Sequence, residues 1–253
     1  MKVIDSISNN LIKHIIDLKN TSYQKEQGKY LIEGEKMVKL AYDLNKVEYI
    51  LVTEKYNYEH FKHENNLIII SEKVSKKITS LKNHQGYFAV CNIDTANFND
   101  NSNYLLLDDI QDPGNMGTLL RSACAFGFLN VVASENTVSF YNDKVLRATM
   151  SNHFLLNLHV VCDLENFIKE IKNDDIEIIG SYLGDEIVSN HLRIKTKNKV
   201  ALILGNEGKG INKQLIKYFD NNIIIKMDNG VDSLNVGVAG SILMKDIYYQ
   251  KSE

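Results

Sequence analysis

Three polar loops that contain glycine hold most of the residues in this sequence that could do chemistry. The first covers 108–117, DDIQDPGNMG, and is followed by Arg121. The second is GNEGKG at 205–210, and the third is KMDNGVDSLN at 226–235. Their amides, carboxylates and guanidinium could orient a substrate and stabilise developing charge, and glycine lets backbone amides approach a ligand. Each loop is therefore a candidate part of a binding or catalytic site.

The first loop predicts a tight turn between a buried strand and a helix. Pro113 and Gly114 form the turn, and Asn115 is placed to cap the helix. Arg121 follows within two helical turns and could reach the same cleft. The alternative is a well-made turn followed by a surface arginine.

A metal site is not expected. Asp108, Asp109 and Asp112 lie close together in sequence, but no histidine or second carboxylate cluster has ligand spacing. His60 and His63 are interpreted as surface residues of a charged segment. The three cysteines are far apart and are interpreted as small buried thiols.

The second and third loops give weaker signals when taken alone. GNEGKG has neither the spacing of a phosphate-binding Walker loop nor that of a dinucleotide-binding GxGxxG turn. In the third loop Ser233 is interpreted as the cap of a final helix. Gly237, Gly240 and Ser241 give that helix a face of small residues, which permits close packing against another backbone.

Strands that alternate with helices must position these loops. The expected strands of the second half are 104–107, 130–133, 155–161, 176–181, 200–204 and 223–226, with helices at 116–126, 144–150, 164–172, from 212, and 234–250. This alternation predicts an α/β fold with a mainly parallel sheet and helices on both faces. Ligands in such folds bind beyond the carboxyl ends of the strands, where the three loops lie.

The first half predicts a separate, small α/β domain. Its expected strands are 30–32, 47–53, 67–71 and 86–93, and apolar residues recur at helical spacing over 11–18 and 37–44. The polar segment ANFNDNSN at 96–103 is the expected linker. The predicted domains are therefore 1–95 and 104–253.

Composition excludes some classes of protein. No segment has the roughly 20 consecutive apolar residues of a membrane span, and no signal peptide is apparent, so a cytoplasmic protein is expected. The net charge of −3 argues against a general nucleic-acid coat. Residues 1–95 carry 14 lysines and 12 acids (+2) and the rest carries 15 basic and 20 acidic residues (−5), so any RNA contacts are expected first in 1–95.

The three loops together resemble a known family. DPGNMGTLLRSA, LILGNEGKGI and MDNGVDSLNVGVA, in this order, closely resemble the three motifs of the SpoU (TrmH-like) RNA ribose methyltransferases of the SPOUT superfamily. YLIEGEKMVKLA and QGYFAVC resemble the substrate-binding domain that precedes the catalytic domain in many members. The resemblance covers nearly the whole chain.

The resemblance implies a fold, a cofactor and a partner. It implies a deep trefoil knot in the second domain, a homodimer formed through that domain, and S-adenosylmethionine as the methyl donor. The RNA would be structured, with large-subunit (23S) ribosomal RNA expected and transfer RNA as the alternative. Carried over by position, the cofactor-binding residues are Leu204, Gly205, Asn206, Gly210, Ile225, Met227, Ser233 and Leu234.

The residues carried over as catalytic are Asn115, Arg121, Glu207, Ser233 and Asn235. Arginine remains protonated in proteins, so Arg121 is expected to grip a phosphate or stabilise an alkoxide rather than act as a simple base. Asn115 and Asn235 are expected to orient the ribose, with Ser233 supporting them, and Glu207 to hold its loop in shape.

Departures from the family pattern and rival interpretations stay open at this point. Lys226, Ser151 and Asn157 stand where the family often has proline, glycine and proline, and His153 could face the cleft. One rival is a nicotinamide enzyme that uses a Gly114-x-x-Gly117 turn. Another is an RNA-binding protein that has lost catalysis.

Overall fold

The computed structural model describes residues 3–94, 97–182, 199–228, 230 and 233–250. The chain divides into two compact units, Met1–Asp94 with Tyr141–Leu146, and Thr95–Phe140 with Arg147–Glu253. The sequence predicted two continuous domains, so it did not predict that residues 141–146 belong with the first unit. No helix among the described residues is both long enough and apolar enough to span a membrane.

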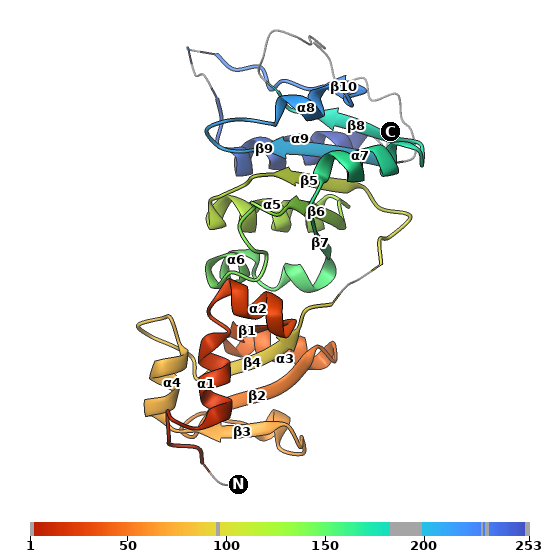
Figure 1. Ribbon diagram of the computed structural model, residues 1–253. Coiled ribbons are helices and arrows are strands. Elements are labelled where there is room, and N and C mark those ends of the chain that lie inside the picture. The colour runs from red at the N-terminus through yellow and green to blue at the C-terminus, as the bar shows by residue number, and fades with distance from the viewer. Residues whose placement is uncertain (1–2, 95–96, 183–198, 229, 231–232, 251–253) are drawn as a thin grey trace. The chain divides into compact units, whose positions relative to one another are not determined.

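The first unit is a four-stranded mixed sheet with helices on it (Figure 1). The sheet order is β1-β4-β2-β3, and only β2 and β3 are parallel. The elements are α1 (Asn10–Asp17), α2 (Thr21–Gln27), β1 (Lys29–Glu33), α3 (Glu35–Asp43), β2 (Val47–Thr53), η1 (Glu59–Phe61), β3 (Leu67–Ile70), α4 (Glu72–Ile78) and β4 (Tyr87–Asn92). Helices α2 and α4, of seven residues each, were not among the elements expected from the sequence.

The core of the first unit forms where α1 and α4 cover the sheet. Ile12 and Ile15 of α1 pack with Val74 and Ile78 of α4 over buried strand residues such as Phe88. These helices are amphipathic, so one face is buried and the other meets solvent. The exposed residues of α4 are all lysines.

The second unit holds a six-stranded parallel sheet in the order β10-β8-β9-β5-β6-β7 (Figure 1). The elements from β5 onward are β5 (Tyr104–Asp108), α5 (Pro113–Ala125), β6 (Asn130–Ser134), α6 (Asp143–Thr149), η2 (Asn152–Leu155), β7 (Asn157–Val161), α7 (Leu164–Lys172), β8 (Ile176–Gly180), β9 (Lys199–Gly205), α8 (Lys213–Ile216), β10 (Asn221–Asn222) and α9 (Val236–Gln250). The expected α/β fold with a parallel sheet is confirmed.

Helices cover both faces of this sheet. Phe167 and Ile168 of α7 pack in one cluster with Ile203 of β9. The next residue along β9, Leu204, points to the other face, where it lies against Gly240 of α9. This alternation is the two-residue period of a strand buried on both sides.

The strand expected at 223–226 is not formed. Strand β10 is instead Asn221–Asn222, and its pairing with β8 ends at the pair Asn222 and Gly180. Strand β8 ends there, so the apolar residues that follow have only one further backbone bond to it, from Ile223 N to Gly180 O at 2.9 Å. Among the described residues, the polar pair forms the strand because it lies beside β8, which ends at Gly180.

The small-residue face of α9 packs inside the chain. A Cβ on Gly240 would lie 2.4 Å from Leu119 of α5 and 2.5 Å from Leu204 of β9. One on Gly237 would lie 3.3 Å from Thr118, and the hydroxyls of Ser122 and Ser241 hydrogen-bond at 2.7 Å. The close packing that this face of small residues permits is therefore made with α5 and β9 of the same chain.

Candidate active site

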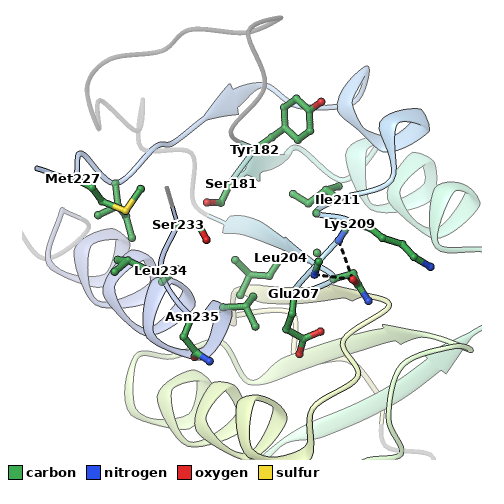
Figure 2. A pocket seen from close by; sticks show the side chains of 17 residues that line it. Ser181, Tyr182, Leu204, Glu207, Lys209, Ile211, Met227, Ser233, Leu234 and Asn235 are labelled. Atoms are coloured by element: carbon green, nitrogen blue, oxygen red, sulfur yellow. Dashed lines mark hydrogen bonds between the residues drawn. The ribbon is translucent and has the colours of Figure 1, made fainter. Parts of the chain in front are cut away.

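A pocket of about 520 Å³ lies where the carboxyl ends of β8 and β9 meet the start of α9. Figure 2 shows its labelled side chains around an open space, with Met227 and Leu234 on one side and Lys209 and Ile211 on the other. Its lining residues are Ser181, Tyr182, Leu204, Gly205, Asn206, Glu207, Gly208, Lys209, Gly210, Ile211, Ile225, Met227, Ser233, Leu234, Asn235, Val236 and Ala239. The volume is in the range of roughly 300–1,000 Å³ that small-molecule sites occupy.

All eight residues predicted to bind a cofactor line this pocket. They come from the end of β9 with the second loop, and from Ile225 with the third loop, which are separated in sequence. The structure thus brings them together, and their role in binding stays a prediction.

Glycine is required at the floor of the pocket. A Cβ on Gly205 would lie 2.3 Å from the Gly210 carbonyl carbon and 2.3 Å from the Ile211 nitrogen. Gly210 has φ +72°, which side chains other than glycine rarely adopt. Between them, Asn206 and Gly210 exchange two backbone hydrogen bonds of 3.0 and 2.9 Å, which close a tight turn.

The side chain of Asn206 joins the second loop to the first. Its Oδ1 accepts hydrogen bonds from the amides of Gly208 and Lys209 at 2.9 and 3.0 Å. Its Nδ2 donates to the Asp109 carbonyl at 2.8 Å. Asp109 itself has φ +59°, so the first loop bends sharply at the point where this bond holds it.

A chain of side-chain hydrogen bonds connects all three loops. Asn235 Nδ2 donates to Asn115 Oδ1 at 2.8 Å, and Asn115 Nδ2 donates to Glu207 Oε1 at 2.9 Å. Glu207 also accepts from the backbone amides of Gln111 and Asp112 at 3.3 and 3.2 Å. Three of the predicted catalytic residues therefore hold one another, and Asn115 is 8% exposed.

These bonds determine the ionisation of Glu207. Burial by itself would raise the pKa of this carboxyl, but the hydrogen bonds from Asn115, Asp112 and Gln111 outweigh it and lower the pKa. Glu207 is therefore an anion occupied by three donors. Such a group suits holding the loops better than accepting a proton.

Asp108 is in the opposite situation. Burial raises the pKa of its carboxyl, the nearby Asp109 charge adds to that, and the Asn212 amide, which donates to Asp108 Oδ2 at 2.7 Å, opposes both. Its bond to Asn212 fixes the start of α8 behind the pocket.

For both α5 and α9, the residue predicted to cap the helix is not the residue that caps it. Asp112, not Asn115, caps α5, because its side chain accepts from the Asn115 amide at 2.8 Å and Pro113 is the first helical residue. Asn235, not Ser233, caps α9, with Oδ1 accepting from Gly237 at 3.0 Å.

Ser233 and Arg121 stand apart from the hydrogen-bonded chain. Ser233 is exposed and lines the pocket, but among the described residues it has no hydrogen bond to support Asn115 or Asn235. Arg121 is exposed on α5, does not line the pocket, and makes no ion pair within the part of the chain that the structure describes. Six residues at about 100° each place Arg121 roughly 120° around the helix from Asn115.

The sequence motifs did not include Ser181 and Tyr182. They follow β8 directly, and backbone N and O of Tyr182 bond the Asn222 side chain, each at 2.9 Å. A Cβ on the preceding Gly180 would lie 1.9 Å from the ring of Phe219, so the strand end fits tightly. Their position at the carboxyl end of an expected strand was the only available signal.

The structure also shows the position of His153 and how the side chains of metal-binding types are grouped. His153 is 3% exposed and does not line the pocket, so it does not face this cleft. Burial lowers the pKa of its ring to about 4. Within residues 3–94, 97–182, 199–228, 230 and 233–250, no group of three His, Cys, Asp or Glu side chains could hold a metal ion.

Comparison with solved structures defines the class of fold. The chain matches the AdoMet-bound rRNA methyltransferase from Sinorhizobium meliloti with a TM-score of 0.87 and 23% identity, over 98% of each chain. It matches the SpoU methyltransferase AviRb from Streptomyces viridochromogenes, also in complex with AdoMet, with a TM-score of 0.81 and 18% identity, over 96% and 99% of the two chains. The fold is therefore that of these methyltransferases.

Sequence comparison gives the family. The SpoU rRNA Methylase family model matches residues 102–245, and the MRM3-like substrate binding domain matches residues 9–89. The chain is 31% identical to the 23S rRNA (guanosine(2553)-2'-O)-methyltransferase RlmP of Bacillus subtilis, over 96% of this chain and 98% of that protein. It belongs to the SpoU rRNA methylase family, as the three loops predicted.

Proposed function

We propose that this protein transfers a methyl group from S-adenosylmethionine to a ribose 2′-hydroxyl of large-subunit ribosomal RNA. The observation that carries the proposal is the pocket itself, which gathers all eight residues predicted for the cofactor and three of those predicted for catalysis. Family membership and the relative named for 23S rRNA support the same reaction and substrate.

The pocket residues fit S-adenosylmethionine. Leu204, Met227 and Leu234 offer apolar surface for a flat adenine, while the turn at 205–210 presents backbone groups where a side chain would not fit. When bound, the cofactor supplies an electrophilic methyl group on a sulfonium. Glu207 and Lys209 are the charged side chains of the described lining.

The chain's own residues have separate tasks in this proposal. Glu207, Asn115 and Asn235 keep the loops in one arrangement, which reduces the entropy lost when nucleophile and methyl donor are aligned. Arg121, exposed and protonated, holds an RNA phosphate or stabilises the ribose oxygen as its proton leaves. Ser233 at the pocket wall is free to contact the ligand.

We further propose that the second unit contains a trefoil knot and forms a homodimer in the cytoplasm. After β10, at the edge of the sheet, the chain returns to place α9 beside α5, which a threaded C-terminus would explain. Exposed Val238, Tyr248 and Tyr249 on α9 offer apolar surface for a second copy.

The rival interpretations have less support. Gly117, needed for a dinucleotide turn, packs instead against Ala148, since a Cβ there would lie 2.2 Å from the Ala148 side chain. Transfer RNA is not favoured, because a second relative, RlmB of Xylella fastidiosa (strain Temecula1), is also named for 23S rRNA. That relative is 30% identical over 58% of this chain and 59% of its own length.

The test is transfer of a radiolabelled methyl group to purified large-subunit, small-subunit and transfer RNA, followed by digestion to nucleosides. We expect label in a 2′-O-methylnucleoside from large-subunit RNA. Label on a base would refute the ribose assignment, label only in transfer RNA would refute the substrate class, and absence of cofactor binding would refute the proposal as a whole.

A further inference from the structure

One helix of the first unit carries lysine at every exposed position. In α4 the side chains of Val74, Ser75 and Ile78 are buried, whereas Lys73, Lys76 and Lys77 are exposed. Positions 73, 76 and 77 fall on one side of a helix, three and four residues apart. We call these three residues the α4 lysine face.

One acid of the same helix, Glu72, interacts electrostatically with Lys76, but its carboxylate pairs with Lys55 at 3.0 Å. None of the lysines of the α4 lysine face makes an ion pair within the described part of the chain. Elsewhere in the first unit, by contrast, Lys29 pairs with Glu48 at 2.7 Å and Lys46 pairs with Asp94. Residues 72–86 carry four lysines and one glutamate, 4 − 1 = +3, in a chain whose net charge is −3.

A further cation lies at the end of the lysine face. Lys19, which follows α1, donates to the carbonyls of Lys77 and Thr79 at 3.0 and 3.1 Å, which satisfies the end of α4. Burial lowers the pKa of Lys19 and the charge of Lys77 adds to that change, while Glu33 and Asp143 oppose it. Lys19 therefore fixes the end of α4 through its two hydrogen bonds and lies close to Lys77.

The loop after α4 is anchored by hydrogen bonds to other parts of the first unit. Thr79 Oγ1 donates to Glu33 at 2.5 Å and accepts from the Leu81 amide at 2.9 Å. Tyr56 donates to the His84 carbonyl at 3.2 Å, and the His84 ring lies 3.2 Å from the Ser75 hydroxyl. These anchors are at the two ends of the loop.

The middle of that loop is open to solvent. Lys82 and Asn83 are exposed, and Leu81 is 38% exposed. Because the ends are already fixed, a ligand that contacts these residues need not order the loop first. The surface is thus a cationic helix face followed by a preformed polar loop.

We propose that the α4 lysine face and Lys82 bind phosphates of the RNA that the enzyme methylates. This inference rests on the proposed function and adds the surface that recognises the substrate. Lysine forms point-charge contacts with phosphate and releases counterions, so it contributes affinity without reading sequence. It also explains how a chain of net negative charge can hold RNA, through one local patch.

The experiment compares two triple variants of the full chain. The test variant is Lys73→Gln, Lys76→Gln and Lys77→Gln, which removes the charge but keeps an unbranched polar side chain of similar helix propensity. The control is Lys29→Gln, Lys46→Gln and Lys62→Gln, which removes the same charge from lysines that are paired with acids. Binding to large-subunit ribosomal RNA transcribed in vitro is measured across salt concentrations, with methyl transfer, cofactor affinity and melting temperature measured in parallel.

For the test variant we expect RNA affinity to fall at least about tenfold near physiological salt, and the slope of log affinity against log salt to become shallower by about 2. KM for RNA should rise while kcat and cofactor affinity stay unchanged. The control should stay within about twofold of wild type. Adding Lys82→Gln should reduce the slope by a further ~0.7.

Other outcomes are distinguishable. If wild type binds and methylates RNA but the test variant matches the control, the surface is wrong and the proposed function stands. If the test variant binds the transcript normally but fails only on ribosomal particles, the face binds a ribosomal protein, which also overturns this inference. If wild type neither binds nor methylates RNA, the proposed function fails and this inference fails with it.

Discussion

The pocket of the second unit and the lysine face of the first unit differ in how far their polar side chains are bonded to other groups of the protein. Around the pocket, Asn235, Asn115 and Glu207 bond to one another, and Asn206 bonds to backbone groups. On α4, the lysines make no ion pair within the described part of the chain. Holding a small cofactor requires walls that do not move, whereas binding a polyanion requires charge that is still available. The difference indicates that the pocket suits a small cofactor and that the lysine face suits RNA.

The largest expected effect comes from adding a side chain at the tightly packed turn of the pocket. Gly205→Ala should abolish detectable cofactor binding and methyl transfer, a loss of more than about 100-fold, because the new Cβ would meet backbone atoms at 2.3 Å. Titration calorimetry with S-adenosylmethionine is the measurement. Gly208→Ala is the matched control, since its Cβ would meet only the Asn206 side chain at 3.6 Å. Equal behaviour of the two variants would contradict the argument.

Arg121 belongs with the unpaired cations although it lies on a helix of the pocket unit. Arg121→Ala should lower kcat/KM for RNA by about 100-fold to 1,000-fold, as removal of one group that stabilises developing charge does in other enzymes. Cofactor affinity should not change, because Arg121 does not line the pocket. Arg121→Lys should recover little if a planar fork is needed. Near-normal turnover of either variant would remove Arg121 from the chemistry.

His153 is buried, so folding favours its neutral ring over its protonated ring. Burial lowers the pKa of this ring to about 4 in the folded chain, against about 6.5 when unfolded. The neutral ring therefore contributes stability above pH ~6.5 that is lost as the pH falls toward 4, up to about 3 kcal/mol. Urea unfolding from pH 7 to 4 should show this loss, and His153→Gln should reduce it. A variant with the wild-type pH dependence would contradict the assignment.

The smallest effect concerns the bond between Asn115 and Asn235. Asn235→Ala should lower the free energy of unfolding by about 1–3 kcal/mol, because the buried Asn115 oxygen loses its donor and α9 loses its cap. Asn115→Ala should lower it by about 1 kcal/mol, because its hydrogen bonds to Asn235 and Glu207 are lost. The double variant should lose less than the sum, with a coupling of about 1 kcal/mol. Denaturant titration of the four proteins measures it. Simple additivity would show that this contact does not join the two loops energetically.

Sequence reasoning located the loops because periodicity and turn residues are local signals. The strands that lead to the first and second loops were expected and are formed, and a parallel sheet necessarily gathers their carboxyl ends. The choice between neighbouring cap residues was wrong, because Ser233 and Asn235, like Asp112 and Asn115, are all acceptable caps and tertiary bonds decide among them. Only the fold shows that Asn235 also bonds to Asn115.

Two further features were not predicted, for different reasons: the place of Ser181 and Tyr182 in the pocket, and the direction in which Arg121 points. Ser181 and Tyr182 have no motif, and they reach the pocket only because β8 lies beside β9 in the sheet. The exposed direction of Arg121 could have been calculated from helix geometry, since six residues leave it about 120° from Asn115. What it meets in the RNA complex is a property of the partner and not of this sequence alone.

The cap of α9 has a consequence for local stability. Asn235 both starts this helix and bonds to Asn115, while Val236 and Ala239 of the first turn line the pocket. Fraying of that turn and opening of the pocket are therefore one equilibrium. A ligand that binds only the closed form shifts this equilibrium by RT ln(1 + [L]/Kd). Slower hydrogen exchange at the amides of Gly237 and Val238 would then report an occupied pocket.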